Sequence, residues 1–276
     1  MAVIGEPRRL GVPASEARLR FEVEPRGPES AGRRLIVVDG EPSFELSHWC
    51  GTCQFLFRRL EGSRETLSPE ALRERLAGEL AGLDSDVMDA FGALLPDGDY
   101  LPVLLRVEPR LVVPGQDGDY FSGEQVATWG VDQFWGLPEY PHTPYYRTFE
   151  TAVDGDAHLY EFVVPMVPPT WNDRDRVAEY VEEMGRGVIP TAVAVSVLDL
   201  CQPSIDLWST DYHQHWGLTH FLLDGHHKVE AAAAAGRPVR LLSLVAVGEG
   251  LSEAEHHRRL AALRSQPRAS RPNPEP

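Results

Sequence analysis

Lysine is almost absent from this sequence: Lys228 is the only one, and every other residue among the 26 basic ones is arginine. Acidic residues are in excess, and the formal net charge is −16. A strongly negative chain repels polyanions at long range. The sequence also lacks a stripe of arginine with interleaved aromatic residues, which nucleic-acid-binding surfaces usually carry. We therefore expect that nucleic acid is not a partner.

Long apolar runs and cysteines are scarce as well. No run approaches the roughly 20 apolar residues that span a bilayer, and the first residues lack the charged-then-apolar order of a signal peptide. Three cysteines are too few for the disulfide framework of a small secreted protein. These absences predict a cytoplasmic protein with no membrane partner.

The alternation of strand-like and helix-like segments predicts a mixed α/β (α+β) protein. Its 276 residues, 42% of them hydrophobic, suffice for one large domain or two ordinary ones. We expect four segments: an irregular lead-in (1–32), an N-terminal α+β domain (33–157), a second α/β domain (158–250), and a C-terminal helix with a disordered tail (251–276).

Local patterns predict the elements within these segments. Strands are expected at 34–38, 43–46, 103–107, 110–113, 158–167, 190–198, 221–223 and 239–247. Helices are expected at 54–60, 68–80, 86–95, 173–184, 228–235 and 252–264. Ser68 and Pro69 are typical of a helix start, and Gly236 of a helix end.

The most informative segment is Asp224-Gly-His-His-Lys228, which follows a short apolar strand and precedes an alanine-rich helix. A strand that passes through a glycine into a helix presents free backbone N–H groups and the positive end of the helix dipole. Both features favour phosphate. Lys228 then adds a positive charge close to the same anion.

Further motifs surround this segment in a fixed order. They are a helix with a glycine at its end (177–187), a proline-initiated strand (Ile189-Pro-Thr-Ala-Val-Ala-Val), the Leu222-Leu-Asp-Gly-His-His-Lys turn, and a closing Ala-Ala-Gly-Arg-Pro-Val-Arg-Leu-Leu. In this order the stretch from Leu159 to Val247, about a third of the chain, resembles the ParB/sulfiredoxin superfamily. Members of that superfamily partition DNA with CTP, phosphorylate free serine with a nucleotide, or reduce oxidised cysteine with ATP.

The resemblance implies a nucleotide or phosphate site at Gly225, His226, His227 and Lys228. It further implies ATP or another nucleotide with Mg²⁺, and a phosphotransferase that acts on a small molecule. In that reaction His226, His227 and Lys228 would neutralise charge, and Glu161 or Asp224 would activate the acceptor hydroxyl. Relatives usually have arginine where this chain has Lys228. The cysteine that sulfiredoxins carry after the glycine is replaced by His226, which argues against cysteine repair.

A second motif is His48-x-Cys50-x-x-Cys53. Two thiolates at this spacing can reach one zinc ion, with His48 as the third ligand. The motif therefore predicts an alternative to the phosphotransferase: a non-enzymatic interaction module stabilised by Zn²⁺. Trp49-Cys-Gly-Thr-Cys53 also resembles the thioredoxin active-site motif, in which a helix follows the cysteines and lowers the pKa of the first. The third alternative is therefore a disulfide reductase that uses Cys50 and Cys53.

Five of the ten histidines are gathered between His213 and His227. His213 and His215 have the spacing of metal ligands on a strand. The polar residues around them favour a solvated loop over 209–217 instead.

Overall fold

The computed structural model describes residues 2–25, 32–131, 138–203 and 214–269. The strands are β1 (Val3–Ile4), β2 (Arg8–Leu10), β3 (Leu19–Glu24), β4 (Arg33–Val38), β5 (Glu41–Leu46), β6 (Phe57–Arg59), β7 (Gly98–Val107), β8 (Arg110–Val112), β9 (Tyr145–Asp154), β10 (Ala157–Pro165), β11 (Thr191–Cys201), β12 (Gln214–Asp224) and β13 (Val239–Ala246). The helices are α1 (Arg73–Ala77), α2 (Ser85–Gly92), α3 (Glu124–Trp129), α4 (Arg174–Gly185), α5 (His226–Ala235) and α6 (Ala254–Arg264). The mixed α/β class is confirmed.

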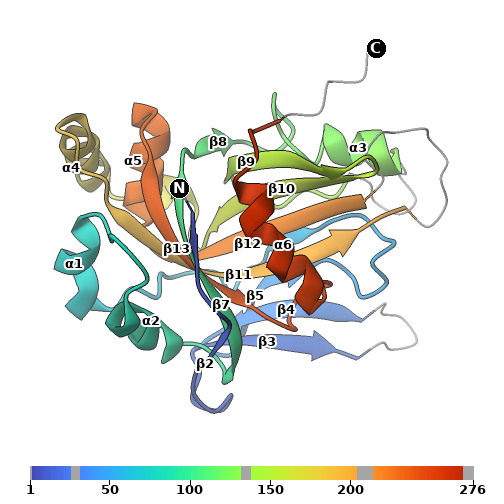
Figure 1. The fold of residues 1–276 in the computed structure, drawn as a ribbon, viewed down its shortest axis with the longest axis horizontal. Coiled ribbons are helices and arrows are strands. Elements are labelled where there is room, and N and C mark those ends of the chain that lie inside the picture. Colours follow the sequence, from blue (N-terminus) through green and yellow to red (C-terminus); the bar gives the residue numbers. More distant parts are fainter. Residues whose placement is uncertain (1, 26–31, 132–137, 204–213, 270–276) are drawn as a thin grey trace.

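These strands form two sheets (Figure 1). The larger has the order β1-β7-β13-β11-β12-β10-β9-β8, with β2 also paired to β7. Only the pairs β10–β12 and β11–β13 are parallel. The smaller sheet is the antiparallel meander β3-β4-β5-β6. The large sheet takes strands from both sides of the expected boundary near residue 157, so the two expected domains share one sheet.

Both faces of the large sheet are covered. Alternate residues of β12 show this, because Leu222 belongs to the buried cluster that includes residues of α5 and α6, while Phe221 belongs to the one that includes residues of the small sheet. Figure 1 shows α4 beside α5, and α6 running across the sheet. β11 is buried from end to end. This is expected for a strand that is covered on both faces.

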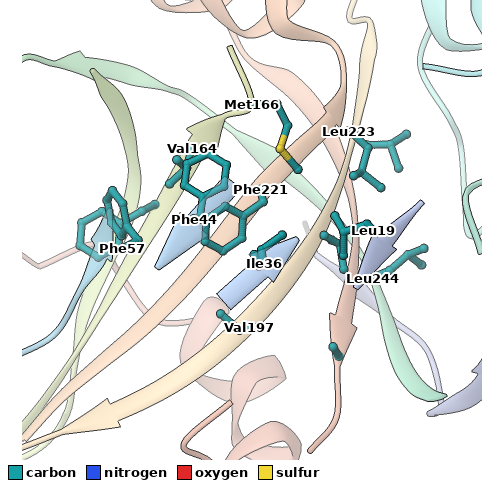
Figure 2. Close-up of a cluster of buried hydrophobic side chains, with 14 of the residues drawn as sticks. Leu19, Ile36, Phe44, Phe57, Val164, Met166, Val197, Phe221, Leu223 and Leu244 are labelled. Carbon is teal, nitrogen blue, oxygen red and sulfur yellow. The ribbon is translucent and has the colours of Figure 1, made fainter. Parts of the chain in front are cut away.

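The core between the two sheets is built from large apolar side chains, several of them drawn in Figure 2. Phe44 of β5 meets Phe221 of β12 with ring centroids 4.9 Å apart. Beneath the small sheet a buried ion pair, Arg34–Asp199 at 3.0 Å, joins β4 to β11. Arg34 also donates to the carbonyl of Ser47 at 2.9 Å. Apolar packing and this polar contact together fix the small sheet on the large one.

Several local predictions are confirmed, among them β4, β5, α2, α4, α5 with its left-handed Gly236, and α6. Others are wrong. The lead-in was expected to be irregular or partly ordered, with a strand-like alternation over 19–23, and it contains β1 and β2 in addition to β3, which covers that alternation. The helix expected over 54–60 is replaced by β6, because Phe55, Leu56 and Phe57 are all buried, which an amphipathic helix does not allow. The helix α3 was not predicted.

Two further predictions need correction. The helix expected over 68–80 is a 3₁₀ turn (Glu70–Leu72) followed by the short α1, and Ser68 does not cap it. The tail beyond α6 is placed as far as residue 269, where the amide of Ala269 donates to the carbonyl of Glu150 at 2.9 Å. Residues 270–276 lie outside the described part of the chain.

Candidate functional site

The turn from β12 into α5 is built on Gly225. Its φ of +96° lies in the left-handed region, and a Cβ atom at this position would stand 2.5 Å from the Cβ of Ala192. Only glycine satisfies both demands. The alanines of α5 let this helix approach the sheet closely, since Ala231 and Ala232 are fully buried. The sequence signal for a strand–glycine–helix turn is therefore confirmed in atomic detail.

The first turn of α5 has unused donors. The amide of Val229 is the first to find a carbonyl within the helix, that of Gly225 at 2.9 Å. The amides of His226, His227 and Lys228 have no acceptor among the described residues, and no side chain caps the helix. Three N–H groups therefore point out of the helix end, where the helix dipole is positive.

A pocket of about 230 Å³ lies at this helix end. Its walls come from three parts of the chain: residues between 66 and 73, the α4 side chains Arg176 and Tyr180, and residues 224–228. Arg73 is exposed and pairs with Glu70 at 2.6 Å. Arg176 is half-buried and makes no ion pair within the described residues. Its guanidinium donates a hydrogen bond to Tyr180, and it has no acidic partner among the described residues.

Lys228 is buried and already bonded. Its ammonium group donates to the Asp224 carboxylate at 2.8 Å and to the carbonyl of Thr191 at 2.9 Å. Burial raises the pKa of Asp224, but the Lys228 ammonium outweighs it and leaves that pKa below its ordinary value. The pair is therefore ionised, and Lys228 fastens the start of α5 to β11. One ammonium hydrogen is left for a ligand.

The two histidines of the turn accept hydrogen bonds from the segment that leads into α4. His226 Nε2 accepts from the amide of Met166 at 3.0 Å, and His227 Nε2 accepts from the amide of Asp173 at 3.1 Å. Burial lowers the pKa of His226 to about 4. Burial and the charge of Arg176 lower the pKa of His227.

At neutral pH the His226 ring is therefore uncharged. Since its Nε2 accepts, the ring proton sits on Nδ1, which can donate a hydrogen bond to a ligand but cannot neutralise its charge. The geometry thus changes the role expected for His226 from cation to neutral donor.

Glu161 is not brought to this pocket. It is fully buried on β10, facing α6, where Thr148 Oγ1 donates to Oε1 at 2.6 Å and Arg264 Nε lies 3.3 Å from Oε2. Burial raises its pKa, but Arg264, His220 and Thr148 outweigh this and hold it at about 2. Glu161 is an ionised anchor for α6 and does not face a ligand bound at Gly225. Of the expected carboxylates, only Asp224 lines the pocket.

The cysteine motif lies at the other end of the sheet, in the connection between β5 and β6. Cys50 is exposed and Cys53 is half-buried. Residues 54–56 that follow have no regular secondary structure and lead into β6, so the helix that a thioredoxin-like motif requires is absent from the described structure there. Among the described residues, no group of three or more His, Cys, Asp or Glu side chains is arranged to hold a metal, so His48 does not join the two cysteines. Zinc binding stays a prediction.

His215 is not in a solvated loop. It is buried on β12, with Nδ1 2.6 Å from the hydroxyl of Tyr120 and Nε2 2.9 Å from Oγ1 of Thr128. It is a core residue between the sheet and α3. His213 lies outside the described residues.

Sequence reasoning missed Arg73, Arg176 and Tyr180 as parts of the pocket. Arg176 and Tyr180 are four residues apart in a predicted helix, so they share one face. That face could be assigned to the Gly225 turn only after α4 was known to pack beside α5.

Comparisons with family models, with curated proteins and with solved structures found no match to this chain. Within the part of the chain that the structure describes, no helix has the length and apolar character required to cross a bilayer.

Proposed function

We propose that this protein binds the phosphate group of a nucleotide or of another small phosphorylated ligand in the pocket at the start of α5. The observation that carries the proposal is the convergence on one pocket of three unused amides, of His226, His227 and Lys228, with Arg176, which makes no ion pair with the described residues. Amides at a helix start and a guanidinium are the donors that phosphate prefers. The ParB/sulfiredoxin resemblance of the same segment agrees with this proposal.

The volume of the pocket limits how much of a ligand it can enclose. Pockets for drug-sized ligands usually occupy about 300–1,000 Å³, and this one is about 230 Å³. A phosphate group with a small substituent fits such a space, and the base of a nucleotide would extend beyond it. The phosphate would then supply most of the affinity, and the protein would distinguish poorly between different bases.

Mg²⁺ in phosphate sites is usually held by one or two carboxylates together with the phosphates. Asp224 and Glu70 are the carboxylates that line this pocket. Each is already paired with a cation, Glu70 with Arg73 and Asp224 with Lys228, so either would hold the ion only by giving up that pair. Asp224 is engaged by Lys228, so it is a weak base for activating an acceptor hydroxyl. The geometry therefore supports binding better than phosphoryl transfer.

Calorimetric titration with ATP, ADP, CTP and inorganic phosphate, each with Mg²⁺, tests this proposal. We expect saturable binding of the nucleotides at one site with little preference for the base. Arg176→Ala should weaken binding about tenfold, which corresponds to about 1.4 kcal/mol. Lys228→Ala is a poorer probe, because Lys228 also holds the turn together.

Arg186→Ala is the matched control, since Arg186 is exposed at the far end of α4 and does not line the pocket. The Arg186→Ala variant should bind the nucleotides with the same affinity as the unchanged protein. Absence of heat with all four ligands would refute the proposal. A phosphotransfer assay with amino acids as acceptors then separates an enzyme from a binding module.

A further inference from the structure

The cysteines lie in a loop that the fold holds in place. We call residues 47–56 the cysteine loop. Its two ends are joined by Ser47, whose Oγ accepts from the amide of Leu56 at 2.8 Å and donates to the carbonyl of the same residue at 3.2 Å. Within the loop the amide of Gly51 donates to the carbonyl of His48 at 3.3 Å, and Gly51 has a φ of +63°. The loop is therefore a closed turn.

Neighbouring elements hold the tip of the loop from outside. The amide of Gln202, just after β11, donates to the carbonyl of Gly51 at 2.8 Å. The indole Nε1 of Trp129 on α3 donates to the carbonyl of Thr52 at 3.3 Å. Contacts from two different elements fix the backbone around both cysteines, so their mutual geometry is set by the fold.

The two thiols differ in a way that suits dithiol chemistry. Cys50 is exposed and Cys53, three residues further on, is half-buried, so a disulfide in solution reaches Cys50 first. Burial raises the pKa of Cys50, but hydrogen bonding from Cys53 and Thr52 outweighs it and leaves the pKa below its ordinary value. Burial and the hydrogen bond to Cys50 raise the pKa of Cys53 to about 12.

From this arrangement we infer that Cys50 and Cys53 form a redox-active dithiol that reduces small disulfides, with Cys50 as the attacking thiol and Cys53 as the resolving thiol. This function is independent of phosphate binding. It rests on the fixed turn, on the exposure of Cys50 and on the half-buried Cys53 three residues further on in the same turn, and it needs no helix after the cysteines.

The exchange balances in two steps. The Cys50 thiolate attacks one sulfur of a disulfide R–S–S–R, which breaks that bond and releases one RS⁻. The Cys53 thiol gives its proton to the departing thiolate, and its sulfur then attacks Cys50 Sγ. The second RS⁻ leaves and takes a proton from solvent. The substrate gains two electrons, and the protein ends with a Cys50–Cys53 disulfide, which an external dithiol can reduce again.

Intact-mass spectrometry after treatment of the full chain with oxidised glutathione tests the inference. The unchanged protein should lose two of its three thiols and carry no lasting adduct. Cys53→Ser, whose hydroxyl can still donate to Cys50, should trap one glutathione on Cys50. Cys50→Ser should form an adduct at least about tenfold more slowly, because the Cys53 thiol that remains in the loop is protonated.

The buried Cys201 provides the control, and Cys201→Ala should still form the Cys50–Cys53 disulfide. Equal trapping by Cys50→Ser and Cys53→Ser would overturn the inference. It would also be overturned if the purified protein held zinc through both thiols and reacted only after the metal was removed. Neither result bears on nucleotide titrations, so the two proposals can fail separately.

Discussion

Two turns of this protein carry the proposed chemistry, and they are made in different ways. The turn from β12 into α5 and the cysteine loop both contain a glycine with positive φ, Gly225 and Gly51. Both direct backbone amides toward a place where negative charge can sit. In the first, local sequence sets the geometry, since a strand, a glycine and a helix follow one another. In the second, contacts from α3 and from the end of β11 set it.

This difference has a physical consequence. A turn at a helix start offers its amides to an external anion, because the helix leaves them unpaired. A turn without a helix uses its amides on its own side chain, here the sulfur of Cys50. The first arrangement suits binding, and the second suits an activated thiol. Variants that disturb one turn and spare the other test this contrast.

The largest effect is expected from Lys228→Met. The change leaves the mostly buried Asp224 carboxylate without its cation and removes the bond to the Thr191 carbonyl. Breaking one side of a buried pair typically costs about 3–5 kcal/mol, which urea unfolding can measure. A loss below about 1 kcal/mol would show that Lys228 does not hold the α5 turn.

Alanine substitutions at Gly225 and Gly51 should destabilise the protein to different degrees and so distinguish the two turns. Gly225→Ala combines left-handed strain with a contact of 2.5 Å to Ala192, and we expect a loss of about 3 kcal/mol in the free energy of unfolding. Gly51→Ala carries only the strain, since its nearest neighbour is the Leu200 carbonyl at 3.6 Å, and should cost about 1 kcal/mol. Equal losses in urea unfolding would contradict the view that a Cβ atom is excluded by close contact at Gly225 and not at Gly51.

Acid should weaken the α5 turn through His226. The folded pKa of about 4 lies below the unfolded value of 6.5, so the neutral ring stabilises the fold fully above pH 6.5. That stability is lost as the pH falls from 6.5 toward 4, by up to about 3 kcal/mol. His226→Gln should flatten the stability profile in this window relative to the unchanged protein. Parallel profiles would show that His226 titrates normally.

The sequence predicted the α5 turn well because its determinants are neighbours in the chain. Strand, glycine, helix and the final Gly236 all follow local rules, and the structure has them where expected. The pocket walls could not be predicted, since Arg73 and Arg176 reach it only through the packing of α4 and of the segment after β6. Glu161 was misplaced for a related reason: strand alternation alone does not say which face of the sheet holds the ligand.

The cysteine loop shows the opposite case. The residues after Cys53 were expected to form a helix, but Phe55 and Phe57 lie in the core between the sheets and Leu56 between them is buried as well. Tertiary burial overrode the local pattern. The reduced pKa of Cys50 was expected from a helix, and it comes from the amides and side chains of the loop itself.

The central claim is that backbone amides at the start of α5 hold a phosphate. Amide chemical shifts of ¹⁵N-labelled protein, recorded during titration with pyrophosphate and Mg²⁺, test it most directly. We predict that the amides of His226, His227 and Lys228 move together and saturate, while those of Gly51 and Thr52 stay in place. Saturable binding that moves other amides and leaves these three unchanged would contradict the claim.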